Sequence, residues 1–198
     1  MVDPYNPLDK TNLGDSVVTA MLVLPAVQLD RISPFEGAGI YAVYYHGSYG
    51  PYRAIAAGEV PIYVGKAVPS GSRKGASLTP TDSGRWLFRR ITEHRDSIDA
   101  AYNLNVADFS VRYLAVDDIW IPLGESLLIS MFGPVWNRSV DGFGNHDPGS
   151  GRYNGLRPLW DVLHPGRAWA DKCKARSETP ADIEQQVIRY LASNRGVS

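Results

Sequence analysis

The apolar and polar positions of the chain form two kinds of pattern, of which the first is typical of β-strands. Residues 39–45 and 60–66 are rich in β-branched and aromatic side chains, with a Gly- and Tyr-rich segment between them. Two such runs are typical of strands that pair as a long hairpin. Residues 109–114 alternate between apolar and polar and predict a third strand. The pattern therefore predicts a small sheet of about three strands.

The second pattern is the recurrence of apolar residues every three or four positions, which is typical of helices. One helix is expected to begin with Ser83 as its N-cap, because the apolar side chains that follow then lie on or beside one face. An apolar helix is expected at 122–132, where Gly133-Pro134 would end it. Further helices are predicted at 15–24, 165–176 and 180–193.

These elements predict an α+β fold, in which a small central antiparallel or mixed sheet is flanked by helices, with helical extensions at both ends. Residues 69–83 and 141–155 are expected to be long loops of the kind that often contact ligands. The 198 residues are enough for one well-buried core and too few to suggest two ordinary domains. We therefore expect one domain over residues 1–198, with residues 1–38 as an N-terminal extension.

Composition limits the compartment and the kind of metal site. Every apolar run falls short of the roughly 18 residues that cross a bilayer, so no membrane association is expected. The single cysteine, Cys173, excludes an intramolecular disulfide and any zinc cluster built on cysteines. Both observations favour a cytoplasmic protein.

The net charge and the distribution of charge along the chain point in different directions on whether the protein binds nucleic acid. A formal net charge of −1 and a pI of about 6.4 argue against a nucleic-acid partner, because phosphate binding needs clustered cations. However, residues 73–95 and 152–176 each contain six Lys or Arg against two acidic residues, which is a net charge of +4 in each segment. The two segments could form one basic face, and a merely solvated surface explains each of them equally well.

Two features of the predicted helices are candidates for chemistry. Glu125 is the only charged residue of the helix at 122–132, and burying it without a partner is costly, so we expect it to be exposed, paired or bound to a metal ion. Arg90 and His94 are four positions apart and share a helix face, either as a functional pair or as an ordinary surface pair. Neither feature decides the function alone.

Five short motifs follow one another along the chain. They are Gly39-Ile40-Tyr41, Ile62-Tyr63-Val64-Gly65-Lys66, Arg90 with His94, Glu125, and Trp136-Asn137. In this order they resemble the GIY-YIG nuclease superfamily, whose core would span residues 39–137. The second motif has Tyr-Val-Gly in place of Tyr-Ile-Gly. Residues 46–60 separate the two motifs more widely than in compact members, as a DNA-contacting insertion or as a long hairpin.

Further stretches narrow the resemblance. They are Lys66-Ala67-Val68-Pro69, the run from Val140 to His146, and the run from Trp160 to Arg167. With these stretches the chain resembles, over about residues 37–176, the type II restriction endonucleases of the superfamily, a subgroup that cuts a GC-rich palindrome of the CCGCGG type.

The resemblance implies a site that hydrolyses phosphodiester bonds with one divalent cation. Glu125 would hold Mg²⁺, with Mn²⁺ as a substitute. Arg90 would stabilise the charge that develops on the phosphoryl oxygens. Asn137 would position the phosphate or the water shell of the metal ion.

The resemblance also implies that Tyr41 is the general base. An unperturbed tyrosine has a pKa of about 10 and is almost fully protonated at neutral pH, so it needs help. His94 would take the Tyr41 proton as the water is deprotonated, and Lys66 or the metal ion would favour the phenolate. Tyr63 would bond the attacking water or a phosphate oxygen.

The implied substrate is double-stranded DNA. Reading a palindrome requires two-fold symmetry, so the resemblance implies a homodimer, with residues 138–198 supporting DNA contact or the dimer. A cognate methyltransferase would protect host DNA without having to bind the nuclease. Guanines are read best by Arg or Lys, although contact with phosphates explains such residues equally well. The candidates are Arg73, Lys74, Arg138, Arg152 and Arg157.

Three alternatives stay open at this stage. A noncatalytic DNA-binding protein could keep the same scaffold, although it has no need of a semi-buried carboxylate such as Glu125. A homing or repair nuclease of the superfamily would normally add DNA-binding modules, for which the chain leaves little room. The run Asn145-His146-Asp147 suggests an HNH nuclease, without the paired metal-binding histidines of that class. Metal-dependent cleavage of DNA separates the enzymes from the binding protein.

Overall fold

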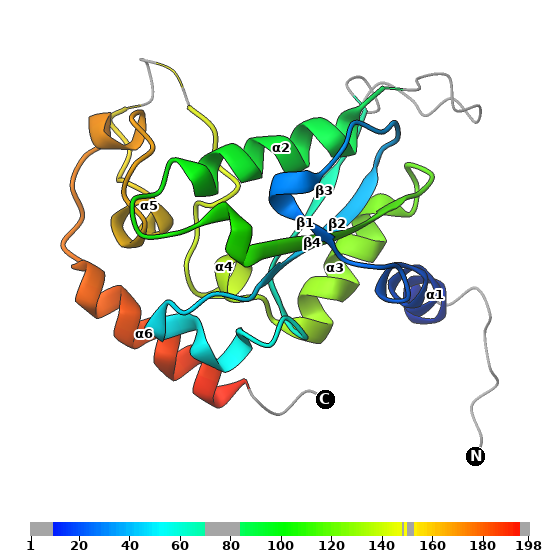
Figure 1. Ribbon diagram of the computed structural model, residues 1–198, viewed down its shortest axis with the longest axis horizontal. Helices are drawn as coiled ribbons and strands as arrows, with labels where there is room; N and C mark the ends of the chain where they lie inside the picture. Colours follow the sequence, from blue (N-terminus) through cyan, green and yellow to red (C-terminus); the bar gives the residue numbers. More distant parts are fainter. Residues whose placement is uncertain (1–9, 70–83, 148, 150–152, 195–198) are drawn as a thin grey trace.

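The computed structural model describes residues 10–69, 84–147, 149 and 153–194 of the chain. An antiparallel sheet of four strands runs through its centre, with helices on both faces (Figure 1). The predicted α+β class is confirmed, and the first two predicted strands pair as the expected hairpin. The strands, in the spatial order β1-β4-β2-β3, are β1 (Val27–Gln28), β2 (Gly39–Tyr45), β3 (Pro61–Ala67) and β4 (Phe109–Ala115).

The sheet has one strand more than the sequence predicted. Val27 and Gln28 of β1 pair with Val111 and Ser110 of β4. A strand of two residues is too short to show the alternation by which strands are recognised in a sequence. Through β1, the N-terminal extension is part of the central sheet.

Six α-helices surround the sheet among the described residues. The apolar helix α3 ends before Gly133-Pro134, as predicted. The predicted N-cap of α2, Ser83, lies outside the described residues, and the helix begins at Trp86. None of these helices is both long and apolar enough to span a membrane. Their bounds are α1 (Lys10–Leu22), α2 (Trp86–Asp99), α3 (Ile121–Phe132), α4 (Val135–Arg138), α5 (Leu159–Leu163) and α6 (Pro180–Ser193).

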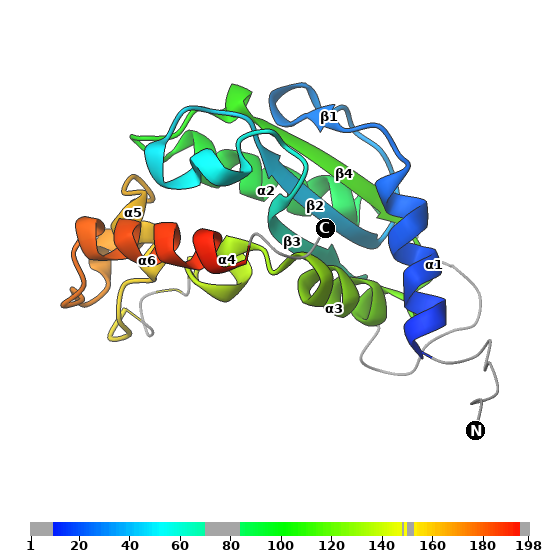
Figure 2. The ribbon, with the colours of Figure 1, turned by 90° about the horizontal axis from the view of Figure 1, so that it is seen from below.

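The central strand β2 separates two hydrophobic cores, because successive side chains of a strand point to opposite faces. The odd-numbered positions from Tyr41 to Tyr45 join a large core with side chains of α2, α4, α5 and α6. The even-numbered positions from Ile40 to Tyr44 join a smaller core with α1 and α3, which lie side by side (Figure 2). All seven residues of β2 are therefore buried.

The prediction of a helix at 165–176 is wrong. Only a short 3-10 helix, η6 (Ala170–Lys172), lies between α5 and α6. The backbone of Lys174 pairs instead with the segment before α5. Its N–H donates to the carbonyl of Gly155 at 3.0 Å, and its carbonyl accepts from the N–H of Arg157 at 2.8 Å. These contacts between separate segments override the local preference for a helix.

The insertion at residues 46–60 is a packed element. It contains a 3-10 helix, η2 (Gly50–Ile55), which lies against α6 (Figure 1, where η2 is cyan and α6 is red). The hydroxyl of Tyr49 donates to Oε1 of Glu184 in α6 at 2.6 Å. The insertion therefore connects the β2–β3 hairpin to the C-terminal helix.

Candidate active site

Strand β2 and helix α2 bring together Tyr41 and His94, which are 53 positions apart in the sequence. The phenol oxygen of Tyr41 lies 2.6 Å from Nε2 of His94. Both side chains are buried, at 0% and 1% exposure. Burial raises the pKa of Tyr41 well above its usual value and lowers the pKa of His94 well below its usual value. At neutral pH both groups are therefore uncharged, and a hydrogen bond joins the phenol oxygen to Nε2 of the imidazole.

Gly65 leaves the space that the Tyr41 side chain occupies. The two residues are direct partners across the β2–β3 pair. A Cβ atom at position 65 would lie 2.6 Å from Cζ of Tyr41 and would overlap its hydroxyl oxygen. Tyr41 of the first motif can therefore occupy this position only because the second motif has a glycine at position 65.

Tyr63 and Arg90 lie next to this pair. The ring centroid of Tyr63 is 6.3 Å from that of Tyr41 and 5.1 Å from that of His94. Burial raises the pKa of Tyr63, and the positive charge of Arg90 acts in the opposite direction on the pKa of both tyrosines. Arg90 is therefore placed to favour the ionised form of either phenol, a part that the resemblance implied for Lys66 or the metal ion.

Hydrogen bonds from two segments hold Arg90 in place. Its Nη2 donates to the carbonyl of Gly144 at 2.8 Å. Its Nη1 donates to Oε2 of Glu93 at 3.1 Å and is also hydrogen-bonded to Nε2 of His146. Partial burial and the charge of Arg90 lower the pKa of His146, so this imidazole is a neutral acceptor.

Glu125 and Lys66 form an ion pair between α3 and β3. Nζ of Lys66 lies 2.6 Å from Oε2 of Glu125, and the side chains are 40% and 20% exposed, respectively. The sequence predicted that the Glu125 carboxylate is exposed, paired or bound to a metal ion. In the structure it is paired and partly exposed. Solvent screening keeps the contribution of such a pair to stability small.

Asn137 contacts the backbone of β3. Its Oδ1 accepts from the N–H of Val64 and its Nδ2 donates to the carbonyl of Val64, both at 2.8 Å. Alternate residues of the edge strand β3 point their backbone groups away from β2, and the bonds to Asn137 show that Val64 is one of them. The side-chain amide therefore completes the hydrogen bonding of the edge, next to Tyr63 and Gly65.

An open cleft of about 480 Å³ joins the polar groups of this region. Tyr41 and His94 are buried beside it, next to Tyr63. The residues that line the cleft include Tyr63, Lys66, Trp86, Arg90, Glu125 and His146.

Comparison with known protein families matches residues 33–191 to the family described as the Eco29kI GIY-YIG domain, a restriction endonuclease family. The chain belongs to this family. The Eco29kI match extends beyond the resemblance at residues 37–176 and reaches into α6. A search of curated proteins gave no match.

Two of the five residues predicted to contact DNA, Arg138 and Arg157, lie in the part of the chain that the structure describes, and neither lines the Eco29kI-type cleft. The other three, Arg73, Lys74 and Arg152, lie outside the described residues. Arg138 is exposed on α4. Nε of Arg157 donates to the carbonyl of Ala170 at 3.1 Å and its Nη2 pairs with Asp171 at 3.2 Å. Arg157 therefore contributes to the packing of the C-terminal segment.

The sequence did not single out several residues around the cleft of this Eco29kI family member. Trp86 and Arg89 line it, and Arg167 is buried near it. His146 also lines it, and the sequence suggested this residue only as part of an HNH-type run. His146 and Arg167 each end one of the runs on which the subgroup resemblance depended. Their position in those runs is the signal that could have selected them.

Proposed function

We propose that the chain is a type II restriction endonuclease that hydrolyses double-stranded DNA at a GC-rich palindrome. In this proposal Tyr41 is the general base, and Glu125 holds one divalent cation. Membership of the Eco29kI family supports a restriction-type nuclease. The observation that carries the proposal is the 2.6 Å contact between Tyr41 and His94, beside a cleft lined by Arg90 and Glu125.

In the proposal, Nε2 of His94 is the proton acceptor that a tyrosine base needs, and its contact with Tyr41 supports this part. As Tyr41 takes a proton from the attacking water, its own proton passes to Nε2 of His94. Arg90 opposes the effect of burial on the pKa of Tyr41 and would stabilise the negative charge that develops on the phosphate. Because Tyr41 is 0% exposed, the attacking water can reach its hydroxyl only after neighbouring side chains shift.

Glu125 is the carboxylate that suits a divalent cation in this cleft. Mg²⁺ commonly takes one or two carboxylates and fills its other positions with water and phosphate oxygens. One carboxylate together with DNA phosphate oxygens would suit Mg²⁺, or Mn²⁺ in its place. When bound, the cation would neutralise charge on the phosphoryl and leaving oxygens. Glu125 would then exchange Lys66 for the cation.

Tyr63 and Asn137 have supporting parts in the proposal. Tyr63 lines the cleft, and its hydroxyl would bond the attacking water or a phosphate oxygen. Asn137 already uses its amide oxygen and nitrogen on Val64, so its main contribution would be to fix β3 and thereby Tyr63.

The proposed substrate also sets the proposed assembly. Cutting both strands of a palindrome is simplest for a homodimer with one site per strand. A methyltransferase of the same recognition sequence would protect the DNA of a host cell. The proposed location is the cytoplasm, where that DNA lies.

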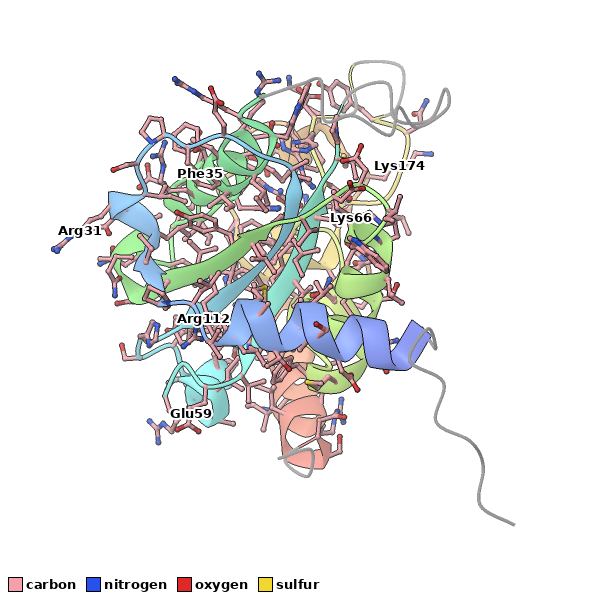
Figure 3. The ribbon with its side chains drawn as sticks, turned by 90° about the vertical axis from the view of Figure 1, so that its right-hand side faces the viewer. Arg31, Phe35, Glu59, Lys66, Arg112 and Lys174 are labelled. Carbon is pink, nitrogen blue, oxygen red and sulfur yellow. The ribbon has the colours of Figure 1, made fainter. Side chains whose placement is uncertain are left out.

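The experiment that tests the proposal is cleavage of mixed-sequence plasmid DNA in Mg²⁺ or EDTA, with sequencing of the cut ends. Glu125→Gln removes the proposed metal ligand at constant size. Glu59→Gln is the matched control, because Glu59 is exposed and far from Lys66 and its partner (Figure 3). We expect discrete Mg²⁺-dependent fragments from the wild type and Glu59→Gln, and intact DNA with Glu125→Gln. Intact DNA with all three folded proteins would contradict the proposal and favour a noncatalytic DNA-binding protein.

A further inference from the structure

Arg167 is a buried arginine that has no part in the roles given above. Its side chain is 4% exposed. Its guanidinium carbon lies 4.5 Å and 4.9 Å from the ring centroids of Trp160 and Trp169. A buried guanidinium is unfavourable unless its N–H groups find acceptors. Here five hydrogen bonds match its five N–H groups.

Two of these bonds reach one carboxylate, and the other three reach one short loop. Nε and Nη2 of Arg167 donate to the two carboxylate oxygens of Asp161, both at 2.6 Å. Nη1 donates to the backbone carbonyls of Phe143 and Asn145 at 3.1 Å and 3.0 Å. Nη2 also donates to the carbonyl of Gly142 at 3.0 Å. Three carbonyls that face one guanidinium fix the path of the loop 142–145.

The loop 142–145 contacts two residues of the candidate active site. The ring of Phe143 stacks on the imidazole of His94, with centroids 4.5 Å apart and planes 20° apart. The carbonyl of Gly144 accepts from Nη2 of Arg90 at 2.8 Å. A shift of this loop would therefore move a neighbour of the proposed proton acceptor and a partner of the proposed phosphate-binding arginine together.

We propose that Arg167 is a positioning residue, which holds the loop 142–145 and through it sets the positions of Arg90 and His94 for DNA cleavage. The inference rests on the proposed function. A buried ion pair commonly adds no more stability than apolar residues of the same size, so stability alone does not account for the Arg167–Asp161 pair. Lysine keeps the charge but has only three N–H groups in another geometry. It can pair with Asp161 and cannot also donate to all three carbonyls of the loop.

The first test compares Arg167→Lys with Val187→Ala, a control that shortens a buried side chain of α6 in the same core. Both proteins are measured where they are folded, by single-turnover cleavage at saturating DNA and by DNA affinity in EDTA. We expect Arg167→Lys to lower the cleavage rate about 100-fold with the affinity unchanged, because displacements of about 1 Å have effects of this size. Val187→Ala should keep the wild-type rate. Equal rates for the two variants would overturn the proposal.

The second test measures the effect of the loop independently of DNA cleavage, by an NMR pH titration of His94. In Arg167→Lys the pKa of His94 should rise towards its usual value as Phe143 loosens, whereas Val187→Ala should leave it unchanged. An unchanged His94 titration in Arg167→Lys would overturn the positioning role. If the wild type does not cleave DNA, the proposed function fails, and this titration still decides whether Arg167 holds the loop.

A second variant keeps the proposal testable if Arg167→Lys does not fold. Asp161→Asn keeps the side-chain size and weakens the other end of the same contact. The cleavage rate should fall and the His94 pKa should rise, both by less than in Arg167→Lys. Wild-type values of both quantities in folded Asp161→Asn would overturn the proposal.

Discussion

Gly65 lies directly opposite Tyr41 in the β2–β3 pair, and the phenol ring occupies the space that a side chain at position 65 would fill. The glycine and the tyrosine belong to different motifs, so the two motifs are two halves of one steric arrangement. The arrangement leaves Tyr41 within 2.6 Å of His94.

Substituting Gly65 by alanine should therefore displace Tyr41. Overpacking of this kind costs about 1–3 kcal/mol of unfolding free energy, and the shifted phenol should also lower the cleavage rate. Gly50→Ala is the matched control, because a Cβ atom there would meet no atom within 4 Å. Chemical denaturation and cleavage assays measure both effects, and equal values for the two alanine variants would contradict the steric explanation.

Removing the hydroxyl of Tyr41 should separate catalysis from binding. Tyr41→Phe keeps the ring and loses the bond to His94. We expect the cleavage rate to fall by about 10²- to 10⁴-fold, with DNA affinity in EDTA unchanged, because a general base acts in the chemical step. Tyr113→Phe is the matched control, since Tyr113 is the direct partner of Tyr41 across the β2–β4 pair and its ring stacks on Phe35. A Tyr41→Phe protein with wild-type activity would rule out Tyr41 as the base.

Asn137→Ala should weaken the edge of the sheet. The substitution leaves the N–H and carbonyl of Val64 without their side-chain partner, at a cost of about 1–3 kcal/mol. Hydrogen exchange of the Val64 amide should become faster, and the unfolding free energy should fall. The exposed Asn194→Ala serves as the control. Unchanged exchange at Val64 would show that Asn137 does not hold the strand.

Buried histidines should make the protein sensitive to acid. The pKa of His164 is lowered to about 3 by burial, against about 6.5 in an unfolded chain. A lowered histidine pKa means that the unfolded state binds the proton first. The contribution of such a histidine to the unfolding free energy is therefore fully present above a pH of about 6.5 and is lost as the pH falls towards about 3. Over this range the unfolding free energy changes by about 1.4 kcal/mol per pH unit for each such histidine.

His164→Gln tests this dependence. Nε2 of His164 is hydrogen-bonded to the Tyr52 hydroxyl at 2.5 Å, and a glutamine oxygen can accept the same bond. Unfolding free energies between pH 4 and 7 should depend less on pH in the variant, by up to about 1.4 kcal/mol per unit. The same slope in both proteins would show that His164 does not cause the acid sensitivity.

Local signals in the sequence were sufficient for the elements that form the site. The bounds of β2 agree with the prediction at 39–45, because seven apolar positions fit a strand buried on both faces. The bounds of α6 agree with the prediction at 180–193, where Thr179 and Asp182 form a capping box and Pro180 starts the helix. The ordered motifs then predicted which side chains would meet, including Tyr41 with His94.

The features that the sequence did not predict depend on contacts between distant segments. Strand β1 is defined by its pairing with β4, and the segment 165–176 by the pairing of Lys174 with residues 155–157. Arg167 looked like one more surface cation, because its carboxylate and carbonyl partners lie 6 to 25 positions away. Secondary-structure propensity depends on residues that are close in the sequence, so it does not predict contacts with distant partners.

The contact between η2 and α6 has a consequence for the order of folding. Residues 50–55 pack against the helix at 180–193, so the large core lacks one wall until these two distant segments meet. Contacts over so great a sequence separation slow folding, because a long loop has to close before they form. The candidate active site, whose Tyr41 belongs to this core, is therefore completed late in folding.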